Sequence, residues 1–163
     1  MLQALQDSAY AEWVRSSWGW AIALTIHAFG VATVAGLIFI MGLRLFGFFR
    51  TVPPTSLGKF FPFIWVGIAL QFVSGFTLWC TKPMDYLKDL VFDIKFTSVV
   101  VGVVITFYFQ KFLKREAAGF QESGVITKRG VYWGVAASLI WAIVIITGRL
   151  TAYLGTLYSG SGG

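Results

Sequence analysis

Four long apolar segments, separated by short polar ones, set the pattern of this sequence. They cover approximately residues 18–41, 60–80, 92–113 and 131–154. Each has roughly the 20 residues that an α-helix needs to cross the hydrocarbon core of a bilayer. The segments are continuously apolar rather than alternating, and a backbone in lipid has to satisfy its own hydrogen bonds. We therefore predict four membrane-spanning helices.

Small and weakly polar residues recur at helical spacing along one side of each apolar segment. Helix interfaces in lipid favour such residues because they let two backbones approach closely. We predict an all-α integral membrane protein in which residues 18–158 form one closed four-helix bundle.

The remaining segments are short. Residues 1–17 place apolar side chains on an approximate helical stripe, with charged side chains away from it, which predicts a short periplasmic amphipathic helix at the membrane interface. Pro53 and Pro54 predict a non-helical turn after the first span, and Pro83 predicts the end of the second. We expect an exposed polar loop over residues 114–130 and a flexible Gly/Ser tail over residues 159–163.

Charge is scarce and unevenly placed. Only 12% of the residues are charged, about half the share found in soluble domains. Basic residues gather at the borders of the segments that join spans one to two and three to four: Arg44, Arg50, Lys59, Lys111, Lys114, Arg115, Lys128 and Arg129. Because such residues are retained in the cytoplasm, we predict a multi-pass protein of the bacterial inner membrane with both termini in the periplasm. The expected partner is the lipid bilayer and no nucleic acid, since no nucleic-acid motif is present.

The single histidine, His27, lies inside the first apolar segment. At 1.5 Å per helical residue it should lie roughly 13 Å below Trp18, and Gln71 in the antiparallel second helix at about 12 Å, so the two are level. Lys95 and Arg149 are expected nearer the periplasmic border. Ionisable residues inside a membrane are costly to bury, which makes His27 a candidate functional residue.

Two interpretations of His27 are open. In the first, a neutral ring hydrogen-bonds Gln71 or another interior polar group and serves helix packing alone. In the second, His27 is the metal ligand of a b-type haem, Gly30 leaves room for the porphyrin, and Lys95 and Arg149 bind the anionic propionates. The candidate cofactor-binding residues are therefore His27, Gly30, Gln71, Lys95 and Arg149. A second axial ligand would come from a partner subunit or a symmetry-related His27, or that position would stay open.

Other chemistry has little support in the sequence. One histidine and one cysteine, Cys80, are too few for a zinc or copper centre built by this chain alone, and a lone cysteine excludes an internal disulfide. No nucleophile–base pair and no pair of buried carboxylates is evident, so we do not expect an independent enzyme.

Short motifs in the first and last spans carry a family resemblance. His27-Ala-Phe-Gly30, Leu43-Arg44-Leu45-Phe-Gly47 and Gly148-Arg149-Leu-Thr-Ala152-Tyr153 resemble an uncharacterised family of small bacterial four-helix inner-membrane proteins. That family is distantly similar to the membrane domain of CopD-type copper-resistance proteins and to b-type cytochrome bundles. The resemblance implies four helices, an inner-membrane location, and roles for His27, Arg44 and Arg149. Those bundles generally have more than one intramembrane histidine, and this chain has one.

These features favour a non-catalytic integral subunit of a larger inner-membrane assembly, respiratory or redox in kind, which docks a periplasmic protein partner and holds a haem at His27. Two alternatives stay open. One is a small copper or solute transport-related membrane protein, and the other is a purely structural membrane scaffold.

Overall fold

The computed structural model describes residues 2–83, 90–123 and 126–159, and this part of the chain is helical without any strand. The short helices α1 (Leu2–Gln6) and α2 (Ala9–Arg15) precede the long helix α3 (Ser17–Leu45). A 3₁₀ helix, η1 (Pro54–Phe60), leads into α4 (Phe61–Trp79), and the chain ends in α6 (Leu90–Ser123) and α7 (Lys128–Ser159). The predicted all-α bundle is confirmed.

Four of these helical segments are long and apolar enough to cross a membrane: Trp18–Leu45, Pro54–Trp79, Leu90–Glu116 and Lys128–Leu150. They contain most of each predicted span and extend some of them at their ends. The exposed loop predicted for residues 114–130 is wrong in its first part, because α6 continues as helix to Ser123. Of the predicted flexible tail, residues 160–163 lie outside the described residues.

The N-terminal segment forms two short helices rather than one. Ser8 separates them because its side chain caps α2, accepting a hydrogen bond of 3.2 Å from the backbone N–H of Ala11. The buried side of α2 consists of Ala11 and Val14, and this helix packs against the start of α3. Tyr10 and Trp13 are about half exposed, at 50% and 52%, so their rings are available to a membrane interface.

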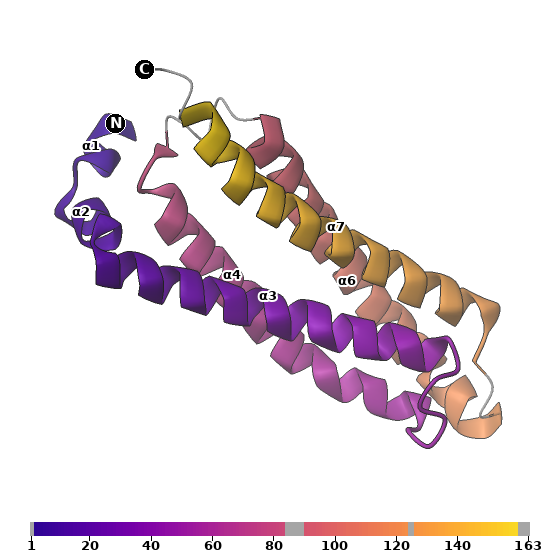
Figure 1. Cartoon of the computed structure of the whole chain (residues 1–163). Coiled ribbons are helices and arrows are strands. Elements are labelled where there is room, and N and C mark those ends of the chain that lie inside the picture. The colour runs from indigo at the N-terminus through magenta and orange to yellow at the C-terminus, as the bar shows by residue number, and fades with distance from the viewer. Residues whose placement is uncertain (1, 84–89, 124–125, 160–163) are drawn as a thin grey trace.

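The four long helices form two pairs that pack against each other. α3 packs against α4, α6 packs against α7, and α3 and α7 join the pairs, whereas α4 and α6 are not packed together along their length. We call the end of the bundle that holds α1, α2 and the C-terminal end of α7 the terminal end, and the opposite end the η1 end (Figure 1). The two pairs lie closer together at the η1 end than at the terminal end. The bundle is therefore less closed than the sequence predicts.

The apolar core occupies only part of this bundle. Its fully buried members run from the middle of the bundle to the η1 end, and they are Val34, Ala35, Ile38, Met41, Leu45, Leu57, Phe61, Ile64, Phe109, Leu113, Ala137, Trp141 and Val144. α4 and α6 meet there through the Phe61 and Phe109 rings and through a 3.0 Å hydrogen bond from Trp65 Nε1 to Gln110 Oε1. The terminal half of α3 and α4 contributes polar residues to the interior instead.

Glycines allow the backbones of neighbouring helices to approach closely. Gly30 of α3 lies against the backbone of α4, where a Cβ atom on it would come within 2.9 Å of the Gly67 carbonyl oxygen. Gly42 of α3 and Gly134 of α7 meet in the same way near the η1 end. These contacts confirm that the predicted small-residue stripes face neighbouring helices.

Candidate functional site

His27 is half-buried on α3 and is held by α4. Its Nδ1 atom lies 3.0 Å from Ser74 Oγ. The Ser74 hydroxyl donates its own proton to the Leu70 carbonyl oxygen at 2.6 Å, so towards the ring it can only accept. Nδ1 therefore carries the ring proton in this arrangement, and Nε2 keeps the lone pair with which an imidazole ligates a metal.

Two glycines make room for this ring between the helices. A Cβ atom on Gly75 would lie 3.3 Å from His27 Cε1, so the ring rests directly against the α4 backbone. One turn further along α3, Gly30 contacts α4 at Gln71, where its added Cβ would come within 3.0 Å of the backbone nitrogen. The close approach of α3 and α4 is thus what places Ser74 within reach of His27.

Gln71 lies about one helical turn from the level of His27, because it contacts Gly30 whereas His27 contacts Ser74 and Gly75. Gln71 is buried, with 6% of its surface exposed. Its side-chain oxygen Oε1 is buried and has no hydrogen-bond partner, the one such side-chain atom found in the described part of the chain. A buried polar atom of this kind costs free energy unless a ligand, a water or a partner supplies the missing bond.

Lys95 comes to this region from α6. Its side chain is half-buried, and it lies near enough to His27 for its charge to act on the ring. Its Cε atom would be 3.9 Å from a Cβ placed on Gly148 of α7, which puts the lysine stem along the α6–α7 pair. Within residues 2–83, 90–123 and 126–159, no carboxylate forms an ion pair with it. Within the described residues, the site thus contains a cation without a carboxylate partner.

Arg149 is not brought into this group. It follows Gly148 on α7, and its side chain is exposed. Of the five predicted cofactor-binding residues, the structure brings together His27, Gly30 and Gln71 at the α3–α4 contact and places Lys95 nearby on α6.

Arg44, which the family resemblance singles out, lies far from this group, at the η1 end. It is buried, and its Nε–H donates to the Val52 carbonyl oxygen. This bond ties the end of α3 to the segment before η1, which includes Gly47 in a left-handed conformation with φ of 102°. The position supports a structural role for Arg44 at a helix end.

Sequence reasoning missed Ser74 as a site residue. It was visible only as one member of a small-residue stripe on the second span. The available signal was its spacing: Ser74 follows Gln71 by three residues, so both lie on the same face of α4. That spacing could have placed a hydroxyl next to a histidine predicted to be level with Gln71.

The donor set allows one kind of metal centre better than others. Among the described residues no group of three or more His, Cys, Asp or Glu side chains lies together. A zinc or copper centre formed wholly by these residues therefore has no support. The single imidazole, with a lysine that has no carboxylate partner among the described residues and an unsatisfied amide oxygen, is a donor set for a cofactor that brings its own metal ligands and acidic groups.

No protein-family model, curated protein or solved structure matches this chain. The four apolar helices define it as a multi-pass membrane protein.

Proposed function

We propose that this chain is a non-catalytic membrane subunit of a larger respiratory or redox assembly and that it holds a b-type haem with His27 as an axial ligand. The observation that carries the proposal is the 3.0 Å contact between His27 Nδ1 and Ser74 Oγ, which fits an Nδ1–H tautomer whose Nε2 can ligate a metal. Histidines that ligate metals usually donate their other ring N–H in this way.

Other residues of the site support the same cofactor. Haem propionates are anionic, and Lys95 is a half-buried cation without an ion-pair partner among the described residues. The terminal half of the bundle, where the helix pairs lie farther apart, is also the half that the buried apolar cluster leaves out. When bound, the haem would supply one-electron transfer. The chain's own part would be to orient the His27 ring through Ser74 and to neutralise the propionates through Lys95.

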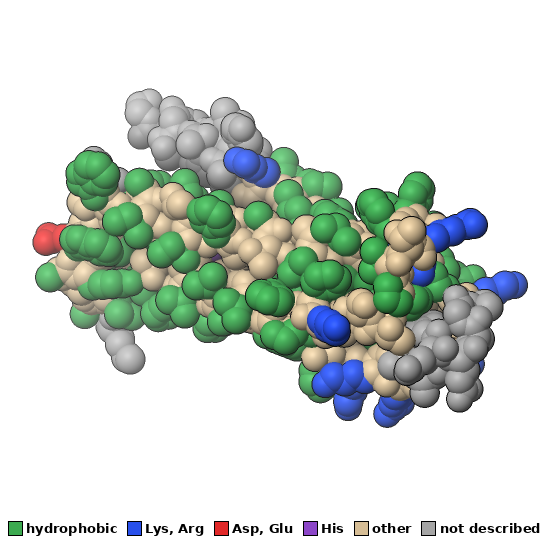
Figure 2. Space-filling view, turned by 90° about the horizontal axis from the view of Figure 1, so that it is seen from below, with side chains coloured by type: hydrophobic (Ala, Val, Ile, Leu, Met, Phe, Trp, Pro, Cys, Tyr) green, Lys and Arg blue, Asp and Glu red, His purple; other side chains and the backbone are tan. Residues whose placement is uncertain are grey.

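The distribution of charge supports the proposed membrane and orientation. Figure 2 shows Lys and Arg side chains gathered at the η1 end, with hydrophobic side chains along the length of the bundle. By the positive-inside rule, this distribution supports a proposed orientation with the η1 end in the cytoplasm and both termini in the periplasm of a bacterial inner membrane. The exposed polar residues Gln3, Asp7 and Glu12 of the N-terminal segment would then face a periplasmic protein partner. Alkaline phosphatase fused to the C-terminus should be active, whereas a fusion between α6 and α7 should be inactive.

The haem is tested by the visible spectrum of the full chain, purified from membranes of cells supplied with haem, before and after dithionite. A Soret band that shifts on reduction is expected in the wild type and should be lost in His27→Ala. Thr25→Val is the matched control because Thr25 is an exposed polar residue two positions away on the same helix. A spectrum without a Soret band, or a Soret band that His27→Ala leaves unchanged, would contradict the proposal that His27 binds a haem.

The subunit role has a separate test. Purification of the chain from its native membranes in a mild detergent, without crosslinking, should retain a stoichiometric partner protein. A chain that purifies alone contradicts this role. If the haem spectrum is also absent, the transport-related and scaffold interpretations remain.

A further inference from the structure

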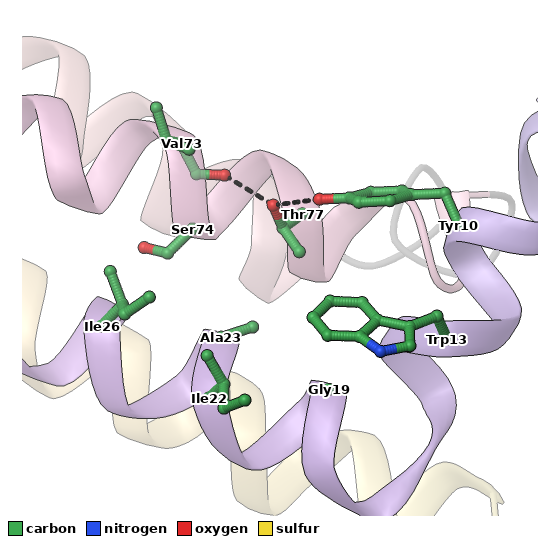
Figure 3. A pocket seen from close by; sticks show the side chains of 9 residues that line it. All are labelled: Tyr10, Trp13, Gly19, Ile22, Ala23, Ile26, Val73, Ser74 and Thr77. Atoms are coloured by element: carbon green, nitrogen blue, oxygen red, sulfur yellow. Dashed lines mark hydrogen bonds between the residues drawn. The ribbon is translucent and has the colours of Figure 1, made fainter.

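A second concave site lies on the outside of the α3–α4 contact, near the terminal end. It is a pocket of about 150 Å³. Nine residues of three helices line it: Tyr10 and Trp13 of α2; Gly19, Ile22, Ala23 and Ile26 of α3; and Val73, Ser74 and Thr77 of α4. Figure 3 shows the two aromatic rings at one end and Ile26, Val73 and Ser74 at the other. An apolar cavity of about this volume accommodates a benzene-sized apolar group.

The pocket opens to the hydrocarbon of the membrane. Ile22 and Val73 on its rim are 47% and 66% exposed, and both belong to membrane-spanning segments. α2 lies across the end of the pocket, so Tyr10 and Trp13 stand where the first span begins. Tyrosine and tryptophan concentrate at this level of membrane proteins, beside the lipid headgroups and ester groups. An occupant would therefore enter from the lipid and have its polar end near the two rings.

The hydrogen bonds of the lining leave no hydroxyl proton free to donate to an occupant of the pocket. Thr77 Oγ1 donates to the Val73 carbonyl oxygen at 3.0 Å, so in its 2.8 Å contact with Tyr10 it accepts the phenol proton. The Ser74 hydroxyl proton is likewise used within α4, on the Leu70 carbonyl oxygen. All three hydroxyl protons of the lining are committed to protein acceptors, which leaves an interior suited to hydrocarbon.

Trp13, at the end of the pocket, provides a hydrogen-bond donor that is not used among the described residues. Its indole N–H donates to no residue within the described part of the chain, and the side chain is half exposed. The complementary ligand is thus a hydrocarbon chain whose polar end carries acceptors and no donors. The ester linkage of a glycerophospholipid has this composition.

We propose that the pocket lined by Trp13, Ala23 and Val73 is a specific seat for the ester-proximal segment of one acyl chain of a bilayer glycerophospholipid, with its ester oxygen near the Trp13 indole. The lipid would come from the leaflet at the terminal end. The site is separate from a haem at His27 and does not depend on one, although both share Ser74. Its occupancy should therefore also be sensed by the His27 ring.

The test uses the full chain in dodecyl maltoside micelles, titrated with dioleoylphosphatidylcholine and observed by native mass spectrometry. One lipid should bind the wild type with saturation. Ala23→Leu, which fills the pocket from a buried position, should weaken binding about tenfold, equivalent to roughly 1.4 kcal/mol. Ala28→Leu makes the same change at an exposed position of α3 and should leave binding unaltered. Val73→Trp, which covers the pocket from an exposed position, serves if Ala23→Leu does not fold.

Competition identifies the part of the lipid that is recognised. Lysophosphatidylcholine, which retains one acyl chain and its ester, should displace the bound lipid, and glycerophosphocholine, which has none, should not. Equal binding by the wild type and both pocket variants would overturn the proposal. So would displacement by glycerophosphocholine, or the retention of a polypeptide in place of lipid.

Discussion

His27 and Ser74 share one hydrogen bond across the α3–α4 contact, 3.0 Å between Nδ1 and Oγ. Because the Ser74 proton is held by the Leu70 carbonyl oxygen at 2.6 Å, the bond has a fixed direction from the ring to the hydroxyl. A serine on one helix thereby selects the tautomer of a histidine on another. The unprotonated Nε2 follows from this direction, and with it the capacity of the ring to ligate.

Replacing Ser74 should release the ring from this tautomer. The chain has one histidine, so ¹⁵N-histidine labelling gives a single pair of ring signals. In the wild type we expect the Nδ1–H form, and in Ser74→Ala a mixture of the two neutral tautomers, with a loss of about 1 kcal/mol in unfolding free energy. Ser74→Thr keeps the hydroxyl and should restore the wild-type signals. A wild-type pattern in Ser74→Ala would show that another group orients the ring.

Gly30 and Gly36 form a matched pair on α3. A Cβ on Gly30 would press on the Gly67 carbonyl oxygen and the Gln71 backbone at 2.9 and 3.0 Å, whereas a Cβ on Gly36 would meet nothing within 4 Å. We expect Gly30→Ala to destabilise the bundle by about 1–3 kcal/mol through forced separation of two backbones. Gly36→Ala should be neutral or stabilise the helix by up to about 1 kcal/mol. Unfolding of both variants in mixed micelles of increasing SDS content measures the difference.

Most of the fold could be predicted because a membrane imposes a simple pattern. Four continuous apolar segments allow little besides four helices, and Gly30, Gly67 and Gly134 of the predicted stripes lie at helix contacts, whereas Gly36 does not. The extent of closure could not be predicted, because small-residue stripes indicate that helices pack but not for what length. The extension of α6 to Ser123 was missed because its polar sequence gives no hydrophobic boundary.

The site was predictable to the precision of a helical turn. Counting residues at a constant rise placed Gln71 level with His27, whereas the structure pairs His27 with Ser74 and Gly30 with Gln71, one turn away. That shift is why Ser74 was missed. The same count cannot tell which way a side chain points around its helix, which is why Arg149, counted into the site, has an exposed side chain.

Lys95 is a half-buried cation that no carboxylate neutralises within the part of the chain that the structure describes. Such a charge inside a membrane protein destabilises the structure unless an anion is bound. Lys95→Met should raise the unfolding free energy of the ligand-free chain by about 1–2 kcal/mol while lowering its retention of haem. Lys111→Met is the control because Lys111 is exposed at the other end of α6. A Lys95→Met chain that is destabilised would indicate that the lysine has a structural partner.

Trp141 and Thr106 join α7 to α6 through a buried hydrogen bond of 3.0 Å from the indole Nε1 to Oγ1. Both side chains are fully buried. Thr106→Val keeps the shape but leaves the indole N–H without an acceptor, which should cost about 1–3 kcal/mol of unfolding free energy. Trp141→Phe in the Thr106→Val background removes the stranded donor. The double variant should therefore lose less stability than the sum of the two single changes, and strict additivity would contradict a direct bond.

Cys80 follows α4 immediately outside its spanning segment, where 3% of its surface is exposed. Burial raises the pKa of the Cys80 thiol because it disfavours the charged thiolate. The thiolate is the nucleophile, so at pH 8 the folded chain should react with maleimide at least about tenfold more slowly than the denatured chain.

The raised pKa of Cys80 also means that the thiol stays protonated to a higher pH in the native state than in the unfolded state. The contribution of the Cys80 thiol to the free energy of unfolding is therefore complete below roughly pH 8.5, and it is lost as the pH rises through the pKa of the thiol in the folded state. Cys80→Ala should abolish the labelling and remove this part of the alkaline loss of stability. Rapid labelling of the folded wild type at pH 8 would show that the end of α4 opens in solution.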